Sequence, residues 1–368
     1  MLVNMNDLID GSPRNELSHF FEDKQIQFLL IHGDAKQVLA KMPRNHVNMC
    51  ITSPPYWQER KYNGIDAIGL ETTVEDYVKH LTQVFHEVKN VLRDDGSLWL
   101  NIGDKYEGKN LLGIPWQVAF SLKNDGWILR NAVIWDKVKG NPSGSKDKLR
   151  NLYEYIFHFV KSRYYSYNLD DIRDMPGKPY YRKGKIITAS GVSGVKYERQ
   201  IKASKHLSET EKEAALNALK ATLKKVETGQ IPDFRMIIRG EQRTTHSNDL
   251  GFSGRAQELA IKGFCILRYN KKGAPPSDIW RIIPEDSWRK DSHFAIFPED
   301  LCEIPIKTSC PPNGTLIDPF VGTGTAIVTA LALGRRAIGI DICQEYLAVA
   351  DERISRHLKE KSGVQTRL

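Results

Sequence analysis

Two stretches of this 368-residue chain carry groups that could do chemistry, and the first runs Thr52-Ser53-Pro54-Pro55-Tyr56-Trp57. It offers a hydroxyl on Ser53, a proline-stiffened backbone with an available carbonyl, and flat rings. Such groups could hold a planar heterocycle by an exocyclic amino group. Acceptors that bind the amino hydrogens turn the nitrogen toward tetrahedral geometry, which frees its lone pair for attack. Alone, however, the tetrapeptide Ser-Pro-Pro-Tyr is better explained as a stiff surface loop.

The second stretch runs Asp318-Pro319-Phe320-Val321-Gly322-Thr323-Gly324-Thr325 and follows a short apolar run, 314–317. A strand, a Gly-x-Gly turn, a helix, a strand and then an acidic residue are typical of a nucleotide-binding unit. The glycines let the backbone approach a ligand, and the helix N-terminus supplies N–H groups. Asp341 lies 17 residues after Gly324 (341 − 324), close to the roughly 20-residue offset of a ribose-binding carboxylate.

The residues around this turn favour S-adenosylmethionine over a nicotinamide dinucleotide. The third glycine of a dinucleotide fingerprint is absent, because Ala326 and Ile327 follow Thr325. Asp318 also precedes the turn, where a carboxylate would repel a pyrophosphate but pair with an ammonium group. S-adenosylmethionine has that ammonium group and a ribose diol for Asp341, and it has no phosphate. No Gly-Lys-Ser/Thr follows the turn, which excludes a P-loop.

The elements that would position these stretches form an α/β pattern. The apolar run 47–51 predicts a buried strand, and the signals across 26–160 alternate between strand and helix, which predicts a doubly wound, mainly parallel sheet. Residues 72–92 read as the clearest helix, with Thr72 and Glu75 as a capping box. Ligands bind at the carboxyl edge of such sheets. We therefore expect both stretches at that edge.

The alternation breaks between about 164 and 290, where we expect an inserted module. Residues 171–290 hold 24 Lys and Arg against 14 Asp and Glu, an excess of +10 in a chain whose net charge is +8. The remainder is therefore about neutral (8 − 10 = −2). Such an excess indicates a polyanion partner, most simply nucleic acid, although a solvated surface would look the same. Residues 1–25 read as a loosely held arm.

Cysteine use and hydropathy exclude several classes of protein. The five cysteines are scattered, without Cys-x-x-Cys, which predicts reduced thiols and neither a disulfide framework nor a metal site. No run approaches the roughly 20 apolar residues of a membrane span. The first residues lack the build of a signal peptide. We expect a cytoplasmic protein of a prokaryote or phage, with no membrane contact.

The two stretches together resemble those of the DNA methyltransferases that modify N4 of cytosine or N6 of adenine. The resemblance extends to Ile134-Trp135-Asp136-Lys137, Glu154-Tyr155-Ile156-Phe157 and His293-Phe294-Ala295-Ile296-Phe297-Pro298. The catalytic stretch precedes the cofactor stretch, as in the permuted β group of that family. A related protein-glutamine methyltransferase has the reverse order, which argues against that class.

This resemblance implies a seven-stranded methyltransferase sheet and four segments. These are an N-terminal arm (1–25), a catalytic half (26–163), a target recognition insert (164–290) and a cofactor-binding half (291–368). The implied cofactor is S-adenosylmethionine. The implied partner is double-stranded DNA, with a cognate restriction endonuclease acting on the same site as a further expected partner. A monomer and a homodimer are both compatible with the sequence.

The resemblance also implies roles for particular residues. In the catalytic loop Ser53, Pro54, Pro55 and Tyr56, the serine and the first proline's carbonyl would grip the target amino group, and the tyrosine would stack on the base. Asp318 would meet the methionine amino group, and Asp341 the ribose hydroxyls. The rest of the cofactor cradle would be formed by Pro319, Phe320, Gly322, Gly324 and Thr325. Asp34 would lie near the adenine and Phe297 beside the methionine, though a turn carboxylate and a core aromatic explain these two almost as well.

The first catalytic position bears on the target base. Relatives with serine there are mostly N4-cytosine enzymes, while aspartate or asparagine is usual for N6-adenine, so Ser53 favours cytosine N4. The alternatives are adenine N6, a catalytically silent DNA-binding scaffold and an RNA substrate. Methylation of cytosine C5 is rejected, because it needs a cysteine nucleophile and no cysteine here has a Pro-Cys-Gln setting.

Overall fold

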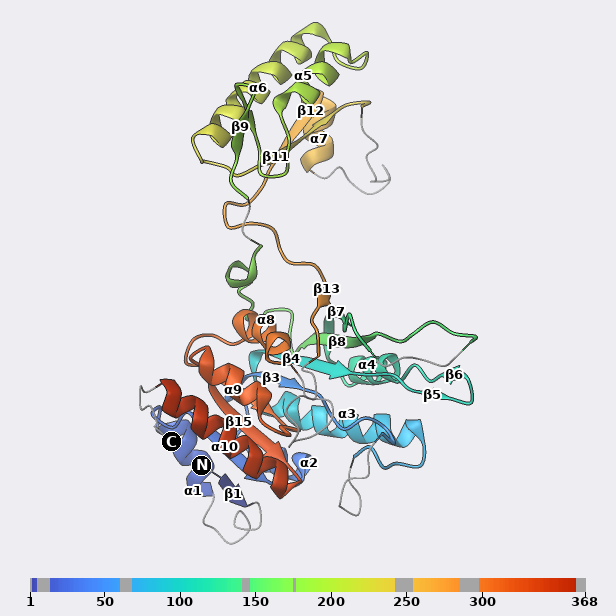
Figure 1. Cartoon of the computed structure of the whole chain (residues 1–368), viewed down its shortest axis with the longest axis vertical. Coiled ribbons are helices and arrows are strands. Elements are labelled where there is room, and N and C mark those ends of the chain that lie inside the picture. The colour runs from blue at the N-terminus through green and yellow to red at the C-terminus, as the bar shows by residue number, and fades with distance from the viewer. Residues whose placement is uncertain are drawn as a thin grey trace. The chain divides into compact units, whose positions relative to one another are not determined.

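The computed structural model describes residues 2–4, 14–59, 68–140, 146–174, 177–241, 254–284 and 298–361. The chain divides into two compact units (Figure 1). One comprises Met1–Asp171 and Ser277–Leu368, and the other Ile172–Pro276. The second unit thus interrupts the first in sequence, within the limits of the predicted insert.

The first unit is built on a nine-stranded sheet. Eight strands run parallel, and β8 alone is antiparallel to its neighbours β4 and β7. The predicted mainly parallel methyltransferase sheet is confirmed, and the short strands β1 and β13 extend its seven strands at the two edges. In spatial order the strands are β1 (Leu2–Asn4), β2 (Phe28–His32), β15 (Arg336–Asp341), β14 (Thr315–Asp318), β3 (Val47–Thr52), β4 (Leu92–Ile102), β8 (Tyr153–Val160), β7 (Ile128–Asp136) and β13 (Ile279–Arg281).

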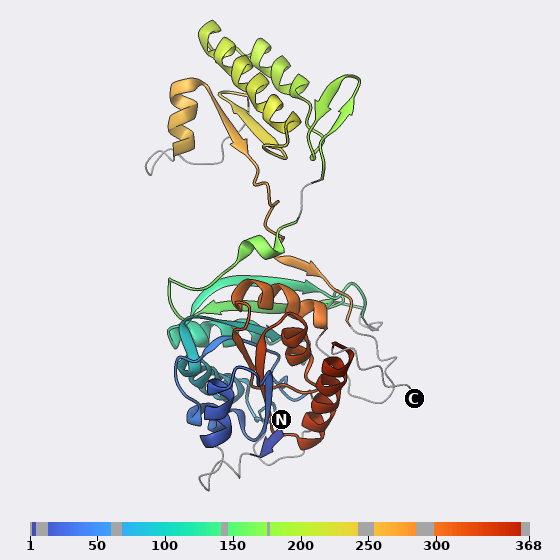
Figure 2. The same ribbon diagram turned by 90° about the vertical axis from the view of Figure 1, so that its left-hand side faces the viewer.

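Helices cover both faces of this sheet (Figure 2). One face carries α1 (Arg14–Glu22), α2 (Ala35–Lys41), α3 (Val74–Val91) and α4 (Ile114–Asn124). The other carries α8 (Glu299–Ser309), α9 (Thr325–Ala332) and α10 (Gln344–Lys361). A small hairpin of β5 (Tyr106–Glu107) and β6 (Asn110–Leu111) follows β4. The arrangement is the doubly wound fold that the alternating strand and helix signals predict.

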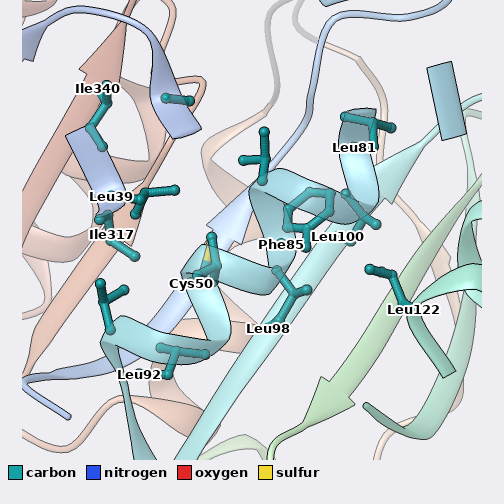
Figure 3. Close-up of a cluster of buried hydrophobic side chains, with 14 of the residues drawn as sticks. Leu39, Cys50, Leu81, Phe85, Leu92, Leu98, Leu100, Leu122, Ile317 and Ile340 are labelled. Atoms are coloured by element: carbon teal, nitrogen blue, oxygen red, sulfur yellow. The ribbon is translucent and has the colours of Figure 1, made fainter. Parts of the chain in front are cut away.

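Alternation along the strands supplies one hydrophobic core to each face. In β3, Cys50 packs in the cluster under α2 and α3, while Met49 and Ile51 pack in the cluster under α8 and α9. Figure 3 shows the first cluster, where Phe85 of α3 meets strand residues such as Leu98. A parallel sheet buried on both faces needs such continuous apolar strands. Its rigidity fixes the loops that leave its carboxyl edge.

Two local predictions are corrected. The segment 1–25 is not simply a loose arm, because α1 buries Leu17 and Phe20 in the core. The Arg336 guanidinium holds the end of this helix by donating to the carbonyls of Phe20 and Asp23, as a cation at a helix C-terminus does. Helix α3 is capped by Thr73, which accepts from the N–H of Asp76, and not by Thr72.

The second unit has a small core of its own. It contains β9 (Tyr180–Arg182), β10 (Lys185–Ile187), α5 (Gly194–Ala203), α6 (Glu209–Glu227), β11 (Phe234–Ile238), α7 (Gly254–Lys262) and β12 (Phe264–Arg268). Helix α6 begins with a capping box, because the Ser208 side chain accepts from the N–H of Glu211 and the Glu211 side chain accepts from the N–H of Ser208. Among the described residues of both units, no helix is long and apolar enough to cross a bilayer.

Candidate active site

The catalytic and cofactor stretches leave neighbouring strands at one edge of the sheet. Strands β3 and β14 are parallel, with Cys50 opposite Ile317. The chain therefore leaves both strands in the same direction. The Thr52 hydroxyl donates to Asp318 Oδ1 over 2.6 Å. This buried hydrogen bond joins the start of one stretch directly to the start of the other.

Two hydrogen bonds hold the catalytic loop rigid. The Tyr77 hydroxyl of α3 donates to the Pro55 carbonyl over 2.8 Å, and the buried Trp57 indole donates to the Glu71 carbonyl over 2.9 Å. No residue that the structure describes donates to the Pro54 carbonyl. That carbonyl can therefore accept from a ligand. The loop supplies a fixed acceptor beside the half-buried Ser53.

A polar network fixes the ring of Tyr56. Its hydroxyl donates to Glu154 Oε2 over 2.7 Å, and the Asn101 amide donates to the same oxygen over 3.0 Å. The Lys137 ammonium pairs with the other oxygen of Glu154. Burial, and then the negative charge of Glu154, raise the pKa of Tyr56 well above its usual value. Tyr56 is therefore a protonated hydrogen-bond donor and a fixed aromatic surface.

Sequence reasoning did not assign a role to Asn101, Glu154 or Lys137. Asn101 lies near the end of β4, Lys137 follows β7, and Glu154 is near the start of the antiparallel β8. All three therefore lie at the same sheet edge. For Asn101 and Glu154, the signal in the sequence was a polar residue in an otherwise apolar strand, since a buried polar group needs a partner.

The Ser53 hydroxyl is only loosely engaged. It lies 3.4 Å from the Tyr56 oxygen, which is the far limit of a hydrogen bond. Gly103 backs the ring, because a Cβ there would come within 2.8 Å of Tyr56 Cε2. Ser53 can thus still accept and donate, and the ring lies close against the backbone at the end of β4.

The glycine turn after β14 is shaped around Asp341. Gly322 and Gly324 have φ values of 49° and 83°, in the left-handed region that favours glycine. The N–H of Gly322 donates to Asp341 Oδ2 over 2.8 Å, and the N–H of Cys343 donates to Oδ1 over 2.9 Å. Each carboxylate oxygen keeps a lone pair for a further donor. Asp341 can therefore still receive two ligand hydroxyls.

Asp318 is a buried carboxyl group that suits a cationic ligand. Its Oδ1 accepts from Thr52 and from the N–H of Phe320 at 3.1 Å. Burial raises the pKa of Asp318 to about 7. Within the part of the chain that the structure describes, no lysine or arginine pairs with it. An ammonium group would supply the missing charge and favour the ionised form.

Helix α10 supports the glycine turn from behind. Arg353 Nη1 donates to the Thr323 carbonyl over 2.9 Å and lies 3.2 Å from Thr325 Oγ1. Its Nη2 donates to Glu299 in the first turn of α8. A Cβ on Gly324 would come within 3.0 Å of the Ala350 Cβ. One arginine therefore ties the turn to the beginning of α8.

The other predicted site residues are Asp34, Pro319, Thr325, Phe320 and Phe297. Asp34 follows β2, which pairs with β15, and it caps α2 by accepting from the N–H of Gln37 over 2.9 Å. It lies at the sheet edge that carries Asp341, but its side chain already accepts the hydrogen bond that caps α2. Pro319 and Thr325 are buried around the turn, and Phe320 is half-buried. Phe297 lies outside the residues that the structure describes.

Comparison with known proteins identifies the family. Residues 47–352 match the sequence profile of the DNA methylases that modify N6 or N4 amino groups. That range covers more than half of the chain. The chain belongs to the N6/N4 DNA methylase family. The matched range contains the catalytic loop, the insert and the glycine turn.

Relatives of this DNA methylase extend over most of its length. The type II methyltransferase M.SfiI of Streptomyces fimbriatus is 29% identical over 87% of this chain and 89% of its own. M.SmaI of Serratia marcescens is 27% identical over 89% of this chain and 90% of its own. The solved PvuII DNA methyltransferase, titled cytosine-N4-specific, covers 92% of this chain and 93% of its own, with a TM-score of 0.54 and 14% identity. This last likeness shows the shared fold.

The methylase uses S-adenosylmethionine as its methyl donor. Its own residues fit that cofactor. No lysine or arginine of the described segments neutralises the buried Asp318, and the half-buried Asp341 retains acceptor capacity. The turn at Gly322 leaves open space where a side chain would otherwise stand.

Proposed function

We propose that this DNA methylase transfers a methyl group to N4 of a cytosine flipped out of duplex DNA at a specific site. The observation that carries the cytosine assignment is Ser53 at the first position of the catalytic loop. Its hydroxyl can accept from the amino group and also donate to the neighbouring ring nitrogen, whereas a carboxylate can only accept. Relatives with serine at this position are mostly N4-cytosine enzymes.

The catalytic loop holds the base by three groups. Ser53 and the Pro54 carbonyl accept the two amino hydrogens, and the Tyr56 ring stacks on the base. Flipping costs a few kcal/mol of stacking and pairing, and stacking on an aromatic ring returns about 1–3 kcal/mol. Because Glu154 and Asn101 hold the tyrosine in place, its side chain loses little conformational freedom when the base binds.

The cofactor side presents the methyl group. S-adenosylmethionine supplies a methyl group activated on a sulfonium. Ionised Asp318 pairs with the ammonium group, and Asp341 receives the ribose hydroxyls. Asp34 beside the adenine and Phe297 beside the methionine are part of the same proposal. The protein aligns the amino nitrogen with the methyl carbon. It does so because the loops that hold the base and the cofactor follow the neighbouring parallel strands β3 and β14.

Proton removal follows the methyl transfer. The amino nitrogen attacks with its own lone pair, so no strong base is needed first. Once methylated, the nitrogen is positively charged and acidic. The Ser53 hydroxyl, a weak base, is sufficient to accept that proton and pass it to water.

The unit at Ile172–Pro276 is proposed to recognise the target sequence. It lies within the basic segment 171–290, whose excess of +10 suits phosphate contacts. M.SfiI and M.SmaI are named type II methyltransferases. We propose by analogy that this chain works beside a restriction endonuclease that cuts the same site.

Modification-sensitive sequencing tests the assignment. DNA from methylation-deficient cells that express the chain would be sequenced, with Asp318→Asn as the inactive control. We expect N4-methylcytosine within one short sequence. N6-methyladenine instead would overturn the base assignment and leave the family untouched. Parallel assays on duplex DNA and RNA would identify an RNA substrate, and cofactor binding without any methylation would indicate a silent scaffold.

A further inference from the structure

An exposed leucine lies among basic residues in the loop between β7 and β8. Leu149 is 90% exposed. A single exposed leucine is ordinary and needs no explanation. Its setting is unusual, because residues 146–150 read Lys-Asp-Lys-Leu-Arg and all are exposed. A phosphate-rich partner is the ligand that such a charge pattern complements.

This loop is attached to the hairpin β5–β6. The Lys109 ammonium lies 2.7 Å from Asp147 Oδ2, and the Lys148 ammonium lies 3.6 Å from the centroid of the Tyr106 ring. These contacts join Asp147 and Lys148, the two residues before Leu149, to the hairpin. Leu149 is therefore displayed on a supported loop.

The loop also connects directly to the candidate active site. It joins β7 and β8, whose ends carry Lys137 and Glu154, and the Lys137 N–H donates to the Leu152 carbonyl over 2.8 Å. Leu149 is five residues from Glu154. At roughly 3.4 Å per extended residue, its Cα lies within about 17 Å of that of the carboxylate that holds Tyr56.

We propose that Leu149 enters the duplex and occupies the space that the flipped base leaves. Lys148 and Arg150 contact the phosphates on either side. This inference rests on the proposed function, because it requires a flipped base in duplex DNA. A flipped base leaves neighbouring bases unstacked, and apolar side chains commonly fill such gaps in bent or opened duplexes. A leucine between two cations combines that wedge with the charge that holds it against the backbone.

The test uses the full-length chain and two duplexes that carry the methylation site. In one duplex the target base is normally paired. In the other it faces an abasic position, so that flipping is already less costly. We expect Leu149→Ala to lower the single-turnover rate on the paired duplex by about tenfold, because opening the duplex loses its support. On the abasic duplex the variant should match the wild type. Leu149→Phe should retain most activity on both.

Matched measurements separate a wedge from a structural role. Phe120, 55% exposed on α4, offers a control, and Phe120→Ala should leave both rates unchanged. Cofactor affinity and the melting temperature should be the same for Leu149→Ala and the wild type. Equal loss on both duplexes, or no loss on the paired one, would overturn the proposal. The wild-type product nucleoside tests the proposed function separately, since the wedge can be measured whichever base is methylated.

Discussion

The Thr52 hydroxyl hydrogen-bonds the buried carboxyl group of Asp318 across 266 positions of sequence. This bond joins the last residue of β3 to the last residue of β14. Thr52 immediately precedes the loop that would hold the base, and Asp318 begins the stretch that would hold the cofactor. One short contact therefore joins the starts of the two stretches.

The affinity for S-adenosylmethionine should depend on pH through Asp318. Its pKa of about 7 in the free protein means that the carboxyl group must lose its proton before it can pair with an ammonium. Below pH 7, the dissociation constant should rise about tenfold for each unit by which the pH falls. Calorimetry at pH values from about 5.5 to 7.5, a range chosen around that pKa, measures this dependence. The Asp318→Asn variant should bind weakly with a flat profile, and an equally steep profile in that variant would refute the assignment.

The same titration predicts a trend in stability. The folded-state pKa of Asp318 lies above the ordinary value of 3.8. Its contribution to the stability of the cofactor-free protein is fully present below pH 4 or so, by linkage, and is lost as the pH rises through about 7. Asp318→Asn should remove this one component of the pH dependence. Thermal melts of the wild type and the variant across that range measure how the melting temperature changes with pH. The same slope in both proteins would show that the carboxyl group titrates normally and would contradict this prediction.

Replacing Thr52 by valine should shift the pH profile. Valine keeps the shape of the side chain but removes the hydroxyl that stabilises the ionised form of Asp318. The pKa of Asp318 should therefore rise further. The pH at which the cofactor begins to bind should move upward with it. An unchanged midpoint in Thr52→Val would show that the bond does not control the titration.

Substitutions of Tyr56 should separate its ring from its hydroxyl. Tyr56→Ala removes the stacking surface and should abolish methylation. Tyr56→Phe keeps the ring and loses the bond to Glu154, so activity should fall by about 10- to 100-fold, as expected for one hydrogen bond to a charged group. Single-turnover assays on duplex DNA measure both. Full activity in Tyr56→Ala would remove this residue from the site.

Arg353 should act on cofactor binding without touching the cofactor. Arg353→Met removes its bonds to Thr323 and Thr325. The KM for S-adenosylmethionine should rise by about 10- to 100-fold, as expected for charged hydrogen bonds, with kcat nearly unchanged at saturation. Arg356→Gln is the matched control, because Arg356 lies on the same helix with a side chain that is 65% exposed, and among the residues that the structure describes it pairs with Glu352 alone. A lower melting temperature with an unchanged KM would make Arg353 merely structural.

Local sequence signals predicted the elements whose determinants lie close together in the chain. The apolar run before Ser53 and the Gly-x-Gly turn after Asp318 each specify a strand and the loop that leaves it. The capping box of α6 is equally local, because Ser208 and Glu211 lie three positions apart. At α3 two successive threonines each precede an acidic residue by three positions. The sequence could not distinguish them, and the structure selects Thr73.

Features that depend on the assembled sheet could not be predicted in this way. The network of Asn101, Lys137 and Glu154 forms only because β8 lies between β4 and β7. Burial of Phe20 in the core holds helix α1 in place. The short β13 falls inside the predicted insert, yet Trp280 pairs with Trp135 at the edge of the sheet. Each case requires contacts between segments far apart in the sequence.

We propose that the two loops at one sheet edge form a single site that methylates an amino group of DNA. The most direct measurement is to incubate the purified chain with methyl-labelled S-adenosylmethionine and duplex DNA, then separate the nucleosides. We predict that the label is recovered in N4-methylcytosine, and that Tyr56→Ala and Asp318→Ala each abolish it. Label on a ring carbon, or no label in DNA from a protein that binds the cofactor, would contradict the account.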